Sequence, residues 1–292
     1  YALCDIQTNS QNVAIGTESL KKNTASNNTA VGYISLRCNT SGADNTSVGL
    51  CSLTANTTAS NNVAVGSAAL RLNTTGANNV SVGRQALCSN TTATCNTGIG
   101  DRTLCANTTG ANNTAVGSFA LCTNTTGDSN VAIGKSSLAA NTTAANNTAV
   151  GKDSLCANTT SENAALGANA LKAQTTGIYN TAVGSNAMIK NTTGTRNVAI
   201  GTTAMGCNTT GSCNTAVGGM DAGTLPVMWL NTTGNQNTAI GNAALVKNTT
   251  ASNNTAVGAL ALYANTTGAS NVAMGYQAGK NTTTGTCNIA IG

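Results

Sequence analysis

Hydrophobic and polar positions follow one block that repeats along almost the whole chain. The block opens with the phrase Asn-(Thr/Val/Ala/Ile)-(Ala/Ser/Gly)-(Val/Ile/Leu/Met)-Gly, which occurs seventeen times. Thirteen of the sixteen steps between these phrases are 17 residues long, two are 16 and one is 23. A fixed period of this kind is typical of a protein in which identical structural units stack on one another. The phrases begin at Asn12, Asn28, Asn45, Asn62, Asn79, Asn96, Asn113, Asn130, Asn147, Asn163, Asn180, Asn197, Asn214, Asn237, Asn254, Asn271 and Asn288.

We number the repeat from the first asparagine, so that the consensus reads Asn-Thr-Ala-Val-Gly-x-x-Ala-Leu-x-x-Asn-Thr-Thr-Gly-x-Asn. Positions 2 to 4 predict a short strand, and the glycine at position 5 predicts a corner where the backbone needs positive φ or close packing. Positions 7 to 9, which usually end in Leu or Met, predict a second short strand. The polar remainder predicts a turn back to the next repeat.

The sequence therefore predicts an all-β fold, a parallel β-solenoid of about 17 turns with a 17-residue period. We expect Val/Ile and Leu columns inside the coil, with Asn and Thr ladders at its corners. Rungs stacked about 4.8 Å apart would make residues 1–292 a single rod roughly 80 Å long. The 23-residue step adds an inserted loop at 219–230.

Three phrases carry a family resemblance: Asn12-Val-Ala-Ile-Gly16, Asn130-Val-Ala-Ile-Gly134 and Asn197-Val-Ala-Ile-Gly201. They resemble the head repeats of YadA-like trimeric autotransporter adhesins, and they are similar to repeats of phage tail fibres and other fibrous surface proteins. The resemblance implies a left-handed β-roll, assembly as a homotrimer, and a role in adhesion. The present repeat is longer than the adhesin repeat because of its Asn-Thr-Thr-Gly turn.

The composition disfavours an enzyme and a nucleic-acid-binding protein. The chain has no histidine, eight Asp and Glu without a recurring pairing, and a net charge of +5 over 292 residues. We therefore expect no enzymatic activity, no cofactor, no nucleic-acid partner and no membrane insertion, because no stretch approaches the roughly 18 apolar residues of a membrane helix. A basic stripe at positions 10 and 11 could contact surface glycans, although charges that keep molecules apart are its commoner meaning. It contains Lys21, Lys22, Arg37, Arg71, Lys172, Lys190, Lys247 and Lys280.

Eleven cysteines favour disulfides in an oxidising, extracellular compartment. Cys88 with Cys95, and Cys207 with Cys213, bracket an Asn-Thr-Thr turn that a disulfide could close. Cys105 and Cys122 occupy the same position one rung apart, within disulfide reach if their side chains face each other. The alternative is that the thiols are small buried hydrophobic groups.

The Asn-Thr-Thr turns match the N-glycosylation sequon. The candidate acceptors include Asn56, Asn73, Asn107, Asn124, Asn191 and Asn231. The alternative is that Asn and Thr serve turn geometry and side-chain ladders. The inserted loop, which holds Met220, Pro226 and Trp229, is a candidate contact site or a clamp folded onto the rod.

Tyr1 enters the repeat at position 7 and Gly292 leaves it at position 5, so one subunit could continue the next. We therefore expect head-to-tail stacking, with Cys287 near Cys4 of the next subunit; the alternative is a trimmed fragment. The favoured function is a structural fibre subunit on a cell or virion surface, which associates with itself as a polymer or trimer and could be adhesive. The alternatives are a phage tail-fibre shaft and, less favoured, an ice-binding protein with threonine columns at positions 13 and 14.

Overall fold

The computed structural model describes residues 2–3, 10–220 and 225–292, and every strand in it occupies positions 2 to 4 of a repeat. Each strand is three residues long, and the described residues contain no helix. The strands are β1 Val13–Ile15, β2 Thr29–Val31, β3 Thr46–Val48, β4 Val63–Val65, β5 Val80–Val82, β6 Thr97–Ile99, β7 Thr114–Val116, β8 Val131–Ile133, β9 Thr148–Val150, β10 Ala164–Leu166, β11 Thr181–Val183, β12 Val198–Ile200, β13 Thr215–Val217, β14 Thr238–Ile240, β15 Thr255–Val257, β16 Val272–Met274 and β17 Ile289–Ile291.

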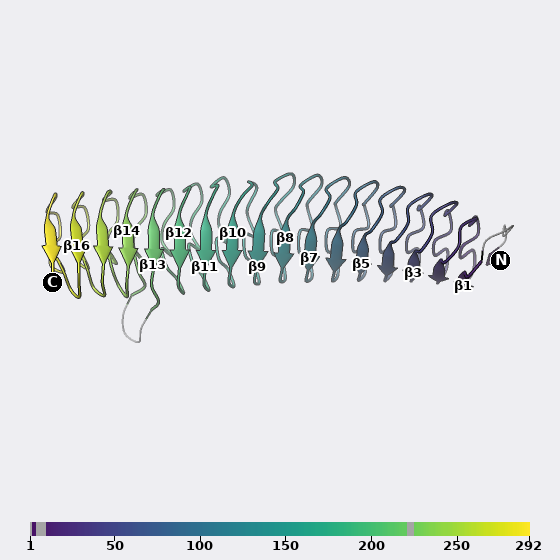
Figure 1. Ribbon diagram of the computed structural model, residues 1–292, viewed down its shortest axis with the longest axis horizontal. Helices are drawn as coiled ribbons and strands as arrows, with labels where there is room; N and C mark the ends of the chain where they lie inside the picture. The colour runs from purple at the N-terminus through teal and green to yellow at the C-terminus, as the bar shows by residue number, and fades with distance from the viewer. Residues whose placement is uncertain (1, 4–9, 221–224) are drawn as a thin grey trace. The chain divides into compact units, whose positions relative to one another are not determined.

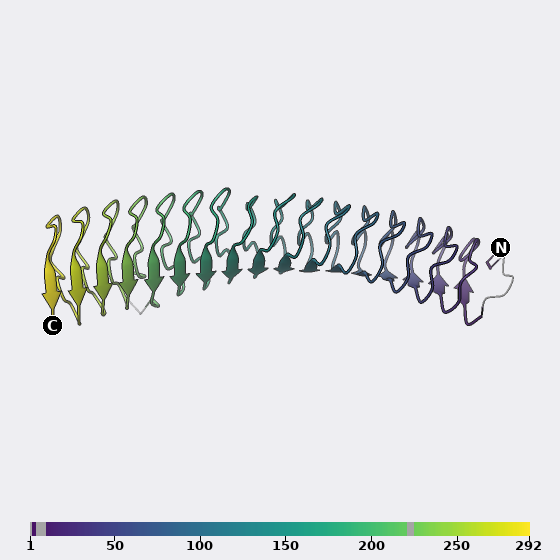
Figure 2. The same ribbon diagram turned by 45° about the horizontal axis from the view of Figure 1, so that its top comes forward.

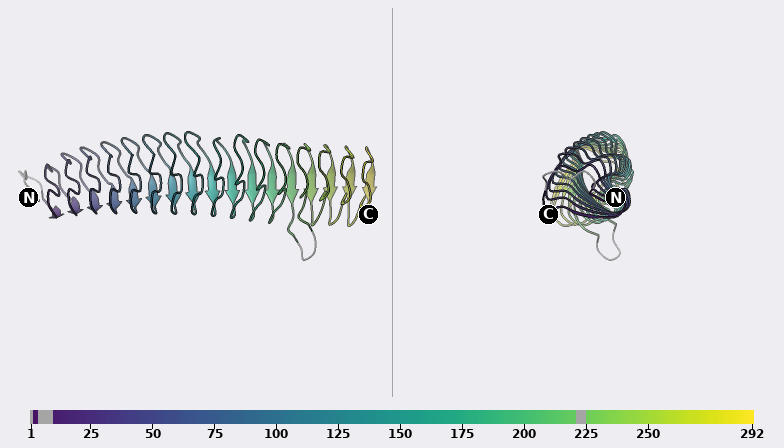
Figure 3. Two further views of the ribbon diagram at one scale, coloured as in Figure 1. Left: turned by 180° about the vertical axis from the view of Figure 1, so that it is seen from behind. Right: turned by 90° about the vertical axis from the view of Figure 1, so that its right-hand side faces the viewer.

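The chain divides into two units, Tyr1–Asn147 with β1 to β8 and Thr148–Gly292 with β9 to β17. Within each unit, consecutive strands pair in parallel and in register, so that Val63 lies beside Val80 and Thr181 beside Val198. The strands of a unit lie side by side along one face (Figures 1 and 2). The rest of each turn loops back behind them (Figure 3). The predicted parallel β-solenoid with a 17-residue period is confirmed, whereas a single rod over residues 1–292 stays a prediction.

The second predicted strand, at positions 7 to 9, is wrong. These residues form a turn in which positions 7 and 9 have positive φ, as at Gln85 (56°) and Leu87 (48°). The backbone still pairs between rungs, because the amide of Leu70 donates to the carbonyl of Ala86 at 3.0 Å. Hydrogen bonds from rung to rung therefore continue through a segment whose left-handed residues cannot form an extended strand.

The predicted interior was also wrong in one respect, because Val and Ile at positions 2 and 4 do not point inward. The inward strand position is position 3, which is always Ala, Ser or Gly; Ala64, Ala115 and Ala199 are completely buried. A narrow coil has room for only one bulky column, and the Leu or Met at position 9 supplies it. Leu70, Leu104 and their equivalents are fully buried, so the predicted Leu column is confirmed.

Two asparagine columns fill the other side of the interior. The position 12 asparagines are completely buried, and most of them donate to the side-chain oxygen one rung earlier: Asn73 Nδ2 lies 3.0 Å from Asn56 Oδ1. The position 1 asparagines accept from the backbone of the next rung, as in the 3.0 Å contact from the amide of Asn62 to Asn45 Oδ1. Burying a polar group without a partner is costly, and each rung pairs most of the buried polar groups of its neighbours; among the described residues, Asn141 Oδ1 and Asn265 Oδ1 are buried without a partner.

The position 5 glycine is required by the fold. Gly66 has φ of +133°, and a Cβ atom on it would lie 2.5 Å from the carbonyl oxygen of Gly83. Successive glycines therefore stack backbone on backbone at this corner, which leaves no room for any side chain.

Candidate interaction surfaces

The outward side chains of positions 2 and 4 form one continuous apolar face in each unit, which we call the outer sheet face. Position 2 is Thr or Val in all but two repeats, and position 4 is always Val, Ile, Leu or Met. The largest of these side chains are partly exposed: Ile99 to 39%, Leu166 to 43% and Met274 to 48%. Positions 2 and 4 hold no charged residue in any repeat, so this face lacks the feature that usually keeps β-structure from associating.

The size of the outer sheet face is that of an interaction site. Three residues per strand and eight or nine rungs give about 10 Å by 40 Å, or about 400 Å² in each unit. Contiguous apolar patches of a few hundred Å² on soluble proteins commonly mark binding surfaces. This face was not predicted from the sequence, because the same side chains were expected in the core.

Charged and aromatic residues follow the outer sheet face along its glycine edge, at positions 6 and 7. Arg84 forms an ion pair with Asp101, with 2.9 Å between Nε and Oδ1, and the guanidinium of Arg102 lies 5.7 Å from the centre of the Phe119 ring. A polar rim beside an apolar centre is the usual organisation of a protein–protein interface.

The structure shows no disulfide among the ten cysteines that it describes. Cys88 and Cys105 occupy the same column as Cys122, and their thiols donate to the carbonyls of Cys105 and Cys122, each at 3.3 Å. Burial, then the neighbouring thiols of Cys88 and Cys122, raise the pKa of the Cys105 thiol. Cys95 and Cys213 are exposed at position 17, while Cys207 is half-buried. Closure of the predicted pairs stays a prediction.

The predicted glycosylation sites are inaccessible in the folded chain. Their side chains are completely buried, and each Nδ2 donates to a neighbouring asparagine or to the carbonyl at position 15. Asn107 Nδ2, for example, donates to Asn90 Oδ1 at 3.0 Å and to the carbonyl of Gly110 at 2.9 Å. A glycan on this nitrogen would remove these hydrogen bonds, and glycosylation of the sequons stays a prediction. The residues are Asn56, Asn73, Asn107, Asn124, Asn191 and Asn231.

The inserted segment packs in part onto its own unit. Val227 and Met228 occupy the core positions 8 and 9 and are fully buried, and Pro226 is buried beside them. Trp229 packs against the backbone of Gly206 one rung earlier, where an added Cβ would approach Trp229 Cε3 to 2.7 Å. Met220 is exposed. Pro226 and Trp229 therefore pack onto their own unit, and a contact role for the inserted loop stays a prediction.

The basic stripe at positions 10 and 11 is partly neutralised. Lys21 Nζ lies 2.6 Å from Glu18 Oε1, and Lys172 pairs with Asp153 at 3.5 Å. Lys247 lies over the ring of Tyr263, 5.2 Å from its centre. A strong attraction for anionic glycans along this stripe is therefore not supported by the charges on it.

The position 13 threonines, predicted as part of an ice-binding array, use their hydroxyls inside the fold. Thr57 Oγ1 donates to the carbonyl of Thr74 at 3.1 Å, and the same contact recurs from rung to rung, as from Thr108 to Thr125 at 3.0 Å. The position 14 threonines, such as Thr58 and Thr75, are exposed. Only one of the two predicted hydroxyl columns is therefore available to solvent.

The predicted end contacts are described only in part. Tyr1 and Cys4 lie outside the described residues, whereas Cys287 and Gly292 are exposed in the last turn.

Searches against known proteins add no family: no family model matches the chain, and no curated protein is significantly similar to it. Within the described residues, no three His, Cys, Asp or Glu side chains come together in a group that could hold a metal ion. None of the described segments is a helix long and apolar enough to cross a membrane. The outer sheet face is thus the surface that most clearly suggests a function.

Proposed function

We propose that the chain is a structural fibre subunit that associates with copies of itself through the outer sheet face. The β-solenoid repeat fold itself is compatible with a fibre-like protein. The proposal rests on one observation: uncharged β-branched and aliphatic side chains face outward, half-buried or exposed, in every rung of both units.

A second copy is the partner that fits this face best. The same face on another molecule has the same rung spacing, so side chains of two copies can interdigitate over many rungs without a change of register. The face of each unit offers about 400 Å², which is about half of the area that each partner contributes to a standard interface of about 1,600 Å². A heterologous partner would need a matching repeat of its own.

A cell or virion surface is the proposed location, and adhesion the proposed use of the assembled fibre. Both follow from the resemblance of the Asn-Val-Ala-Ile-Gly phrases to adhesin and tail-fibre repeats. Trimers through the outer sheet face and head-to-tail filaments are two forms of self-association that the same experiment separates.

The test compares lysine substitutions on the outer sheet face with lysines elsewhere on the same rungs. We expect the purified chain to be oligomeric by sedimentation velocity and the I99K/I133K variant to be monomeric, because a buried lysine at each site would remain unpaired. The matched control is T109K/T143K, which adds the same charge at exposed position 14 of the same two rungs.

Electron microscopy of the same samples shows the form of the assembly. Filaments lost in the I99K/I133K variant would support lateral packing, whereas filaments that persist in it would show stacking end to end. A wild-type chain that is monomeric at all concentrations would overturn the proposal, as would a face variant that remains oligomeric while the control dissociates. Circular dichroism checks that both variants keep the fold.

A further inference from the structure

A notch interrupts the turn surface of the second unit where a repeat is one residue short. The repeat from Asn147 to Glu162 has 16 residues, and the missing residue lies in its Asn-Thr-Thr turn. The shortened turn and the full-length turn after it line an open pocket of about 300 Å³, a volume at the lower end of the range for small-molecule sites. Its lining residues are Thr160, Ser161, Glu162, Ile178 and Tyr179.

The local structure explains why the shortened turn leaves this space without breaking the fold. Asn158 Nδ2 donates to the carbonyl of Thr160 at 2.6 Å, one residue earlier than in a full-length turn. Thr160 Oγ1 donates to the carbonyl of Gly177 at 2.7 Å, which also accepts from Gln174. Among the described residues, Asn141 Oδ1, one rung earlier, is left without a partner, so the shortened turn interrupts the asparagine column at this point while the hydrogen bonds to Gly177 hold the two turns together.

The notch combines a ring, an aliphatic side chain and a carboxylate. Glu162 and Tyr179 are the last residues of consecutive repeats, and both have positive φ, 64° and 60°. Tyr179 is 48% exposed, and the guanidinium of Arg196, from the next repeat, lies 5.6 Å from the centre of its ring. The notch is lined by residues of the preceding repeat and of Tyr179's own repeat, whereas Arg196 comes from the repeat that follows.

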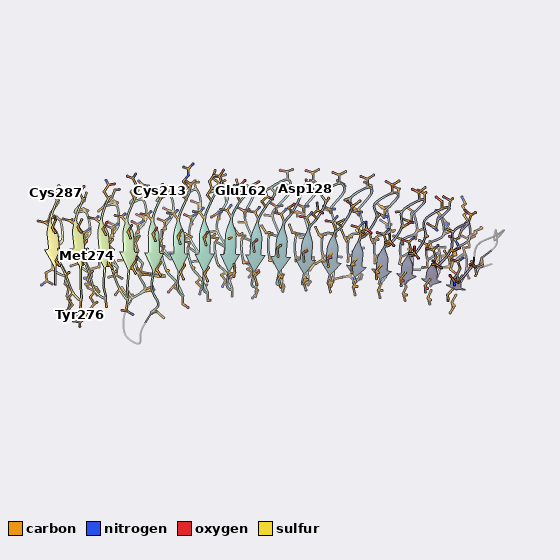
Figure 4. The ribbon with its side chains drawn as sticks, in the orientation of Figure 1. Asp128, Glu162, Cys213, Met274, Tyr276 and Cys287 are labelled. Carbon is orange, nitrogen blue, oxygen red and sulfur yellow. The ribbon has the colours of Figure 1, made fainter. Side chains whose placement is uncertain are left out.

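The carboxylate of Glu162 is available to a ligand. Among the described residues it forms no hydrogen bond or ion pair, and its side chain is exposed. Glu162 lies on the turn edge of the unit together with Cys213 and Cys287, whereas Met274 and Tyr276 lie toward the strand and glycine edge (Figure 4). The notch is therefore separate from the outer sheet face, and ligand binding in it does not depend on self-association.

We infer that this notch binds one pyranose residue of a neutral saccharide. A sugar ring offers a face of C–H groups that packs on the exposed face of Tyr179 and on Ile178, while its hydroxyls donate to the Glu162 carboxylate. The carboxylate disfavours an anionic ligand, and Arg196 near the ring disfavours a cation. A neutral ligand with one apolar face and several hydroxyl donors satisfies all of these groups at once.

The experiment uses saturation-transfer-difference NMR on the full chain with the methyl glycosides of glucose, galactose, mannose and N-acetylglucosamine. For an open site of this size we expect Kd on the order of 1 mM for at least one glycoside. We expect Y179S and E162Q each to weaken its binding at least tenfold. The matched control is Y276S, which removes an exposed tyrosine on the opposite edge and should leave binding unchanged.

A second variant tests the notch without removing any of its side chains. Insertion of one glycine between Thr160 and Ser161 restores a 17-residue repeat with a full-length turn, which should fill the space and abolish binding while thermal stability is kept. The inference is overturned if no glycoside binds at about 20 mM, twenty times the expected Kd. It is also overturned if binding survives in Y179S, or if choline or adenosine binds in the notch and the glycosides do not.

Discussion

Asn56 and Asn73 are hydrogen-bonded side chain to side chain between consecutive rungs, with 3.0 Å from Nδ2 of Asn73 to Oδ1 of Asn56. Asn90, one rung further on, donates to Asn73 Oδ1 at 2.8 Å and so continues the series of hydrogen bonds. Each asparagine is therefore donor to one rung and acceptor from the next, in a dry interior where an unpaired amide is costly. The asparagine column connects consecutive turns by side-chain hydrogen bonds, and the Leu column connects them by apolar contacts.

Replacement of one member tests the value of this column. In N73A, Asn56 Oδ1 loses its partner, while Asn90 Nδ2 keeps its bond to the carbonyl of Ala93, and we expect a loss of about 2 kcal/mol at about 1–3 kcal/mol for a buried unsatisfied group. The control is T75A in the same turn, an exposed side chain whose removal should change stability by less than about 0.5 kcal/mol. Urea denaturation followed by circular dichroism measures both. Equal midpoints for the two variants would contradict a structural role for the column.

Two glycine-to-alanine substitutions should differ strongly in their effect on stability, one at the position 5 corner and one in the inserted loop. G66A would place a Cβ 2.5 Å from the Gly83 carbonyl oxygen at a φ of +133°, so we expect a loss of about 3 kcal/mol or more. In G219A the new methyl group meets no atom of the described residues within 4 Å, and stability should be nearly unchanged. Thermal denaturation of the two variants measures the difference. A G66A protein as stable as G219A would mean that the backbones at this corner are too far apart to exclude a side chain.

The positive φ at position 9 predicts that a β-branched side chain there lowers stability more than an unbranched one of similar volume. Leu104 is fully buried with a φ of 49°, a conformation that a β-branched residue adopts only under strain. L104M should cost less than about 1.5 kcal/mol, because volume is kept and Met188, Met205 and Met228 already occupy equivalent sites. L104I has the same volume but should cost about 1–3 kcal/mol more than L104M through backbone strain. Similar midpoints for L104M and L104I in urea would argue against the left-handed backbone at this position.

The sequence predicted the fold because the period is nearly uniform, and it misplaced side chains because three-residue strands are ambiguous. In Thr29-Ala30-Val31, one face has Thr and Val and the other has only Ala, and the usual preference for bulky residues inside gives the wrong answer. The deciding information is the volume of the coil, which Leu36 already fills. A signal was present: position 3 is small in every repeat.

The turn at positions 7 to 9 had a signal of its own. No Val, Ile or Thr occurs at position 9, although these residues dominate positions 2 and 4, as expected where φ is positive. The notch could not be predicted from the sequence, because its residues are brought together only when consecutive turns stack. Glu162 and Tyr179 are 17 residues apart, and only the in-register stacking of two turns of unequal length brings them to one pocket.

Glu18 makes a prediction about pH. The hydrogen bond from Lys21, at 2.6 Å, lowers the pKa of the Glu18 carboxyl below its ordinary value of 4.5, and Arg37 at 3.4 Å acts in the same direction. Because the pKa is lower in the folded chain, the stabilising effect is present above pH 4.5 and is lost as the pH falls through the folded-state pKa. In K21Q the pKa should rise toward its ordinary value, and in R37Q it should rise less. Carboxyl ¹³C NMR titration of Glu18 measures it; an unchanged pKa in K21Q would show that the pair does not form in solution.

The cysteine column predicts a strict order of thiol reactivity. Alkylation requires the thiolate, and burial together with the flanking thiols of Cys88 and Cys122 raises the pKa of Cys105, so less of it is ionised at pH 8. Cys95 is exposed at the outer end of the turn and should react first, whereas Cys105 should react at least tenfold more slowly, as should Cys156, whose pKa is also raised by burial.

Quenched iodoacetamide labelling with peptide mass spectrometry gives both rates in one sample of reduced protein. The control is the same reaction in 8 M urea, on the order of four times a typical unfolding midpoint, where the difference between Cys95 and Cys105 should disappear because it arises from folding. Replacement of both neighbours in C88S/C122S leaves the burial of Cys105 in place but removes two thiols, so labelling of Cys105 should accelerate only in part. Full recovery of the exposed rate in that variant would show that neighbouring thiols, rather than burial, control the column.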